Sequence, residues 1–142
     1  MELYNRGSIM EALVPKPLES SSPEDLHKGL YKILHGIQKE FGFDEVVIAK
    51  LLHKPRTTVN GWFKNGSVKV SKDKYTPDDV QIYELIELYD TISSYFVKTE
   101  DQVKWLETEH RAFNKLSPLL YIFEHPSHLR DVRRYLEARM NP

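Results

Sequence analysis

Between positions 54 and 69 the sequence gathers side-chain types that bind phosphate groups and the edges of DNA bases. Arginine pairs with guanine, asparagine with adenine, threonine with the backbone or a thymine methyl group, and lysine with phosphate. A helix that begins at Pro55 would turn such residues outward, because Val59 and Trp62 are three apart and face inward together. The candidate DNA-contacting residues are Lys54, Arg56, Thr57, Asn60, Lys64 and Lys69.

The charge of this region favours the same chemistry. From Lys50 to Lys74 the sequence holds seven basic residues and one acid, Asp73, a density typical of surfaces that neutralise phosphates. The formal net charge of the whole chain is −1, but residues 1–75 carry 12 basic and 9 acidic residues, whereas residues 76–142 carry 8 and 12. We therefore expect the two parts of the chain to have different partners.

For these residues to act together, another short helix must precede the helix that begins at Pro55. Asp44 can cap that helix, and the small Ala49 leaves room for another helix to cross closely. The turn falls at His53 and Lys54, so the stretch is a candidate helix-turn-helix. The alternative is a plain amphipathic helix pair that only forms core. The apolar residues of the earlier helix, at helical spacing, are Val47, Ile48, Leu51 and Leu52.

The stretch resembles the Xre-type helix-turn-helix of Cro and phage-repressor-like proteins. The matching residues are Ile48-Ala49, Leu52, Thr58-Val59 and Trp62. His53 replaces the usual turn glycine, Lys54 replaces an apolar residue, and Gly61 within the second helix costs about 1 kcal/mol relative to alanine. The resemblance implies DNA binding, and these departures predict a modest affinity unless dimerisation or another contact adds to it.

Composition predicts one hydrophobic core, or two small helical units that share one, in a chain of 142 residues that is 40% hydrophobic. The absence of cysteine excludes disulfides and cysteine metal sites. Because no apolar run approaches the roughly 18 residues that a membrane span needs, we expect a cytoplasmic protein that binds no membrane.

Helix-start signals recur along the chain and predict an all-α fold. Residues 1–22 read as an N-terminal arm, 23–75 as the helix-turn-helix domain and 76–142 as a helical dimerisation and partner-binding domain. The stretch after Gly66 is either a short extended wing or, as we favour, a basic loop. The helix that starts near Thr76 is apolar around most of its circumference, so we expect it to join the halves or form a homodimer interface. Caps are predicted at Ser22, Thr76, Thr99, Ser117 and Ser127.

The C-terminal part resembles the toxin-binding domain of the MbcA/ParS/Xre antitoxins. The shared order is Trp105-Leu106, Phe113-Asn114, Leu116-Ser117-Pro118-Leu119, then Val132 and Leu136 on a closing helix. With the Xre-like element the resemblance covers about residues 24–142. It implies the antitoxin of a type II toxin–antitoxin system, which blocks a RES-domain toxin that degrades NAD or ADP-ribosylates a target, and which represses its own operon.

The last helix and the tail are the candidate toxin-binding segment. The family's turn glycine is replaced around Glu124-His125-Pro126, and its glycine near the C-terminus by residues 139–142. An arginine-rich helix could enter an NAD cleft and meet groups that handle phosphates or carboxylates; the alternative is a solvated helix face. The candidate toxin-binding residues are Arg130, Arg133, Arg134, Arg139, Asn141 and Pro142.

Catalytic residues are not evident in the sequence. His110, His125 and His128 could ligate a metal, but cap and loop roles explain them as well, so we expect no enzyme, no metal and no cofactor. Two other functions stay open beside the antitoxin. One is a helical adaptor that blocks an enzyme without binding DNA, and the other is a plain phage-type repressor without a toxin.

Overall fold

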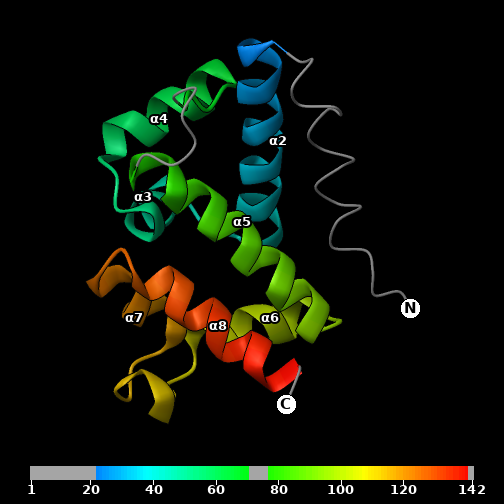
Figure 1. Ribbon diagram of the computed structural model, residues 1–142, viewed down its shortest axis with the longest axis vertical. Coiled ribbons are helices and arrows are strands. Elements are labelled where there is room, and N and C mark those ends of the chain that lie inside the picture. The colour runs from blue at the N-terminus through cyan, green and yellow to red at the C-terminus, as the bar shows by residue number, and fades with distance from the viewer. Residues whose placement is uncertain (1–21, 71–76, 141–142) are drawn as a thin grey trace.

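The computed structural model describes residues 22–70 and 77–140, and the regular structure in these ranges is helical, which confirms the all-α prediction (Figure 1). The predicted arm up to residue 21, the predicted boundary at 75/76 and Asn141 and Pro142 lie outside the described residues. No described helix is long and apolar enough to cross a membrane. With the labels of Figure 1, the helices are α2 (Pro23–Phe41), α3 (Glu45–Leu52), α4 (Arg56–Asn65), α5 (Pro77–Tyr95), α6 (Thr99–Glu107), η2 (Arg111–Phe113, a 3-10 turn), α7 (Pro118–Glu124) and α8 (His128–Met140).

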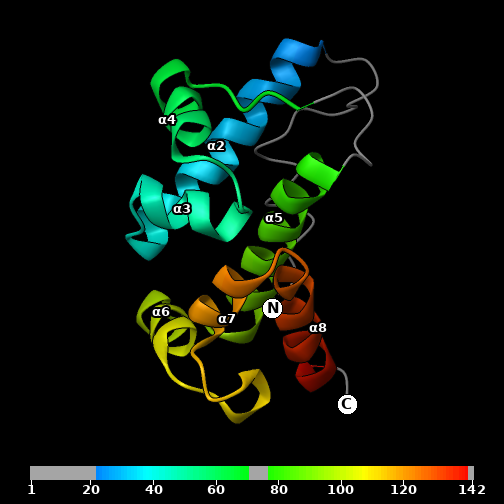
Figure 2. The same cartoon turned by 90° about the vertical axis from the view of Figure 1, so that its left-hand side faces the viewer.

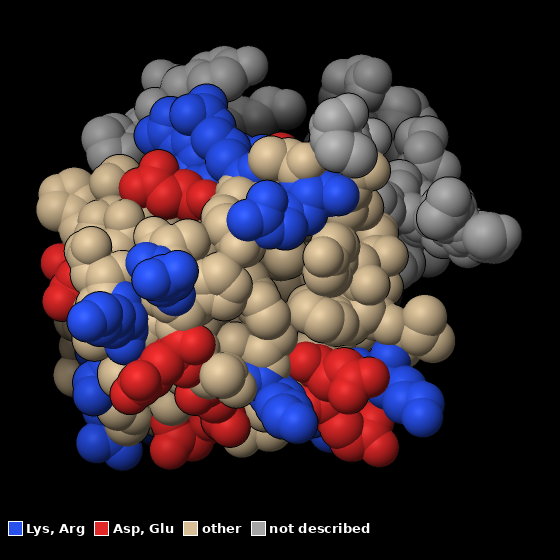
Figure 3. Space-filling view, turned by 90° about the horizontal axis from the view of Figure 1, so that it is seen from below, with Lys and Arg blue, Asp and Glu red and all other residues tan. Residues whose placement is uncertain are grey.

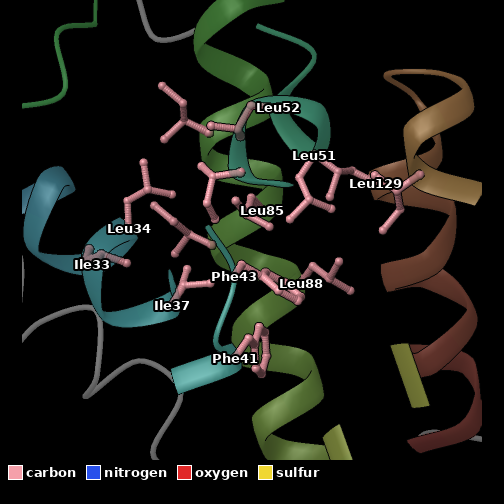
Figure 4. Close-up of a cluster of buried hydrophobic side chains, with 14 of the residues drawn as sticks. Ile33, Leu34, Ile37, Phe41, Phe43, Leu51, Leu52, Leu85, Leu88 and Leu129 are labelled. Carbon is pink, nitrogen blue, oxygen red and sulfur yellow. The ribbon is translucent and has the colours of Figure 1, made fainter. Parts of the chain in front are cut away.

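Helix α5 runs between two groups of helices. The N-terminal half, residues 22–70, packs α2, α3 and α4 at one end, and the C-terminal half, residues 77–140, packs α6, α7 and α8 at the other (Figures 1 and 2). Helix α5 contacts α2, α3, α6 and α8. Leucine side chains of α3, α5 and α8 meet those of α2 in one buried cluster (Figure 4). The halves therefore share a core, as the composition predicts.

Local capping explains several helix ends. The Ser22 hydroxyl accepts a hydrogen bond from the Asp25 amide at 3.1 Å, and the Asp44 carboxylate accepts one from the Val47 amide at 3.0 Å. Helix α2 ends at Gly42, whose φ of 73° is a left-handed conformation that glycine adopts at little cost. The Ser22 and Asp44 caps confirm the predicted starts of α2 and α3.

Two predicted helix starts differ from the structure. Pro55 is the residue before α4 rather than its first residue, with an extended ψ of 143°. Lys98, not Thr99, precedes α6, and no side chain caps that helix. The Thr99 hydroxyl instead donates to the Glu40 carboxylate at 3.2 Å, and the Tyr89 hydroxyl donates to the same carboxylate at 2.7 Å. A contact that links α6 to α2 and α5 thus replaces the predicted local cap.

Residues 67–70 form a loop that returns to α2, which confirms the predicted loop as far as the chain is described. The Val68 amide donates to the His27 carbonyl at 3.0 Å, and the ring of His27 donates through Nε2 to the Val70 carbonyl at 3.0 Å. Val68 is fully buried, while Lys69 between the two valines is exposed. The loop therefore holds Lys69 next to the start of α2.

Candidate nucleic-acid interface

Helices α3 and α4 pack against each other across a short turn. His53 ends α3 with φ 55° and ψ 45°, the left-handed conformation that such a turn requires. Val59 and Trp62 of α4 are buried, with 0% and 7% exposure, so they face inward as their spacing predicts. The buried Ala49 of α3 leaves space for the crossing. The pair therefore consists of two crossed helices joined by a short turn, with an apolar inner side.

The outward side of α4 is polar. Arg56, Thr57, Asn60 and Lys64 are exposed, and α4 carries no acidic residue in its first turn. Gly61 lies on the same side, because it is four residues from Thr57 and three from Lys64. A Cβ atom at Gly61 would meet no heavy atom within 4 Å, so this side of α4 is open to close approach by a partner.

Glu45 of α3 orients one of the candidate residues. The Asn60 Nδ2 atom donates a hydrogen bond to Glu45 Oε1 at 2.9 Å, on the exposed side of the helix pair. The second hydrogen of this amide is geometrically separate from the first, so pairing with a base edge stays possible for Asn60. The sequence alone gives no signal for Glu45, because only the crossing of α3 and α4 brings it beside Asn60, 15 positions later.

His53 and Lys54, at the turn between α3 and α4, each make a contact that fixes the side chain. His53 Nε2 lies 2.7 Å from the Ile122 carbonyl oxygen, and it is the donor because a carbonyl only accepts. The Lys54 ammonium group lies over the Trp62 ring, 6.0 Å from its centroid, in the range of a cation–π contact. His53 therefore joins the turn to α7, and Lys54 lies against the indole ring of Trp62.

A groove opens between α3, the start of α4 and the end of α7. Its volume is about 430 Å³, and we call it the α3–α7 groove. Lys50 lines it from α3, with its ammonium group 5.6 Å from the centroid of the Phe123 ring on α7. The lining residues are Val46, Ala49, Lys50, His53, Lys54, Arg56 and Phe123.

No protein-family model matches the sequence, and no curated protein matches it either. The arrangement of α3, α4 and α8 is therefore the main ground on which a function can be inferred.

Helix α8 is packed onto α5 by one of the candidate toxin-binding arginines. Arg133 is only 17% exposed in its side chain, and it donates to both Glu84 oxygens, at 3.0 and 3.3 Å, and to Glu137 at 3.1 Å. Desolvation lowers the pKa of Arg133. The hydrogen bonds to Glu84 and Glu137 raise this pKa by more than desolvation lowers it, so the net pKa is raised. Arg133 thus holds α8 in place.

The other described arginines of α8 are more accessible. Arg130 is 45% exposed, with its Nε atom 3.9 Å from Glu84, and Arg134 is exposed. The exposed Arg139 places its guanidinium group 4.2 Å from the centroid of the Tyr135 ring. Seen from the lower end of Figure 1, basic and acidic side chains are interspersed around a neutral surface (Figure 3). A partner of this face would therefore meet both signs of charge.

The histidines of the C-terminal half take part in caps and loops. His110 Nδ1 accepts from the Ala112 amide at 3.2 Å, and His125 Nδ1 accepts from the Ser127 amide at 3.1 Å. His128 donates to the Tyr121 carbonyl at 2.7 Å and stacks on its ring. Within the described ranges no group of three metal-ligating side chains occurs.

Proposed function

We propose that the chain is a DNA-binding antitoxin: α4 binds operator DNA, and the C-terminal half blocks a RES-domain toxin. The observation that carries the proposal is the exposed polar side of α4, which lies opposite the buried Val59 and Trp62 in a crossed helix pair. A buried inner side makes α4 a rigid element, and rigid elements position side chains against base edges best.

DNA binding follows from the length and composition of α4. Its ten residues span roughly 15 Å at 1.5 Å per residue, enough to lie in a major groove. Thr57, Gly61 and Lys64 form the central line of the outward side, with Asn60 and Arg56 along one flank. Gly61 lets the backbone of α4 approach the bases closely. The exposed Lys64 and Lys69 are the proposed phosphate contacts, with Lys54 beside the start of the helix.

The antitoxin part of the proposal rests on the resemblance of residues 105–136 to the toxin-binding domain of the MbcA/ParS/Xre antitoxins. It is supported by three accessible arginines on α8, since guanidinium groups pair with phosphates and carboxylates such as those that an NAD-binding cleft handles. Arg130, Arg134 and Arg139 are the proposed contacts, and Arg133 is assigned to the packing of α8 instead. A homodimer would place two α4 helices on one operator and raise the modest affinity of each.

Co-purification of the tagged full chain from its native host tests this function. We expect a stoichiometric partner that consumes NAD, or ADP-ribosylates a target, once it is released, and we expect Arg134→Glu with Arg139→Glu to lose that partner. Recovery of promoter DNA without a partner would make the protein a plain repressor. Recovery of a partner without any affinity for DNA would favour the helical adaptor.

A further inference from the structure

The α3–α7 groove combines positive charge with an apolar floor. Three of its seven lining residues, Lys50, Lys54 and Arg56, are cations, and none of the seven is acidic. Val46, Ala49 and Phe123 are apolar, and His53 completes the lining. Such a lining suits an anion that carries a short apolar part, because the rim supplies charge-assisted hydrogen bonds and the floor excludes water.

The groove is a built feature, since its two walls are tied together. The His53 ring donates to the Ile122 carbonyl at 2.7 Å, which fixes the turn against the end of α7. Lys50 on α3 faces Phe123 on α7 at 5.6 Å from the ring centroid. The C-terminal half therefore supplies one wall of a basic groove whose other wall is the helix-turn-helix.

The groove is also continuous with the outward side of α4. Arg56 belongs to both: it lines the groove and is the first residue of the helix. No side chain caps α4, and its first turn has no acid, so the positive end of the helix dipole adds to the charge there. An anion in the groove would therefore lie beside whatever α4 binds.

We propose that the α3–α7 groove binds a phosphate of the DNA backbone that flanks the segment contacted by α4, with Lys50 as the main cation and Phe123 against the adjoining sugar. This inference rests on the proposed DNA binding. A duplex fits better than an acidic peptide, because Arg56 makes the groove and the outward side of α4 one surface. DNA binding then depends on the C-terminal half, through Phe123.

Fluorescence anisotropy of the full chain with labelled duplexes, at several salt concentrations, tests the assignment. Lys50→Gln removes one charge and keeps a polar side chain, so we expect roughly three- to tenfold weaker binding on every sequence and a log–log salt slope reduced by about 1. Lys50→Arg should restore both the affinity and the salt slope of the wild type. Phe123→Ala should weaken binding without changing the slope. Lys104→Gln, at an exposed lysine of α6, is the matched control and should change neither, and circular dichroism checks the fold of each variant.

The outcomes separate this inference from the proposed function. If Lys50→Gln binds DNA with the affinity and the salt slope of the wild type, the groove assignment is overturned and the proposed function stands. A change of sequence preference instead of slope also overturns it, because a backbone phosphate carries no sequence information. Absence of binding by the wild type to any duplex overturns both. A co-purified acidic protein that only Lys50→Gln releases, with duplex affinity intact, would assign the groove to that partner.

Discussion

His53 Nε2 donates a hydrogen bond to the carbonyl oxygen of Ile122 at 2.7 Å, across 69 positions of sequence. His53 sits at φ 55°, in a conformation where glycine would be less strained. The cost of a left-handed histidine is offset by a hydrogen bond that joins the turn between α3 and α4 to α7. This hydrogen bond is one of several contacts that join the two halves.

Replacing His53 by glycine or by alanine separates the two effects. Alanine loses the hydrogen bond and keeps the left-handed strain, so His53→Ala should lower the free energy of unfolding by about 1 kcal/mol. His53→Gly also loses the bond but relieves strain of about 1 kcal/mol, and it should be nearly neutral. Urea denaturation of both variants measures the difference. Equal stabilities would mean that the turn is not strained at His53.

Gly61 offers a test of close approach to α4. Gly61→Ala should raise the free energy of unfolding by about 1 kcal/mol, because alanine is the better helix former and the added Cβ meets nothing within 4 Å. We also expect weaker DNA binding, since the methyl group occupies the central line of the outward side. Gly36→Ala in α2, where a Cβ likewise meets nothing within 4 Å, is the control and should stabilise without affecting DNA. Equal DNA affinities of the two variants would contradict this role of Gly61.

Arg133 and Arg134 are adjacent in sequence and should behave differently. Arg133→Met leaves the half-buried Glu84 without its bidentate partner, and we expect a loss of roughly 2 kcal/mol in the free energy of unfolding, less than for a fully buried pair. Arg134→Met removes an exposed charge and should change stability by under about 0.5 kcal/mol, while it weakens partner binding. Thermal denaturation of both variants checks the contrast. A stable Arg133→Met variant would show that the ion pair does not fasten α8.

The raised pKa of Tyr89 predicts a loss of stability at alkaline pH. Burial, followed by the hydrogen bond to Glu40, raises the pKa of Tyr89 from 10.0 to about 12. The folded state therefore holds this proton more tightly than the unfolded state, so the contribution of Tyr89 is complete below pH 10 and disappears as pH rises through about 12. Denaturation from pH 9 to 12 should show a shallower decline in Tyr89→Phe than in the wild type. If the stabilities of the wild type and of Tyr89→Phe decline in parallel as the pH rises, the contribution assigned to Tyr89 is contradicted.

Capping residues and helical spacing in the sequence predict much of the fold. The side chains of Ser22, Asp44 and Ser117 accept hydrogen bonds from amides three residues later, so four adjacent residues suffice to predict each helix start. Val59 and Trp62 face inward because their spacing matches the helical period. The polar side of α4 follows from the same periodicity.

Pairs distant in sequence could not be predicted. Thr99 bonds to Glu40 across 59 positions and Arg133 to Glu84 across 49, so the local pattern at Thr99 predicts a cap and no local pattern indicates either of these bonds. Only the packing of α5 against α2 and α8 brings these side chains together. The sequence likewise does not predict that Phe123 lines the α3–α7 groove, because this depends on where α7 lies in the fold.

The central claim is that α4 reads DNA, and a titration of the full chain with two labelled duplexes tests it most directly. One duplex carries the sequence upstream of the chain's own gene, and the other has the same composition in scrambled order. We predict binding at least about 10³-fold tighter to the upstream duplex, and loss of that preference in the Arg56→Ala, Asn60→Ala double variant with the fold intact. Equal affinity for both duplexes, or an unchanged preference in the double variant, would contradict the placement of the recognition helix.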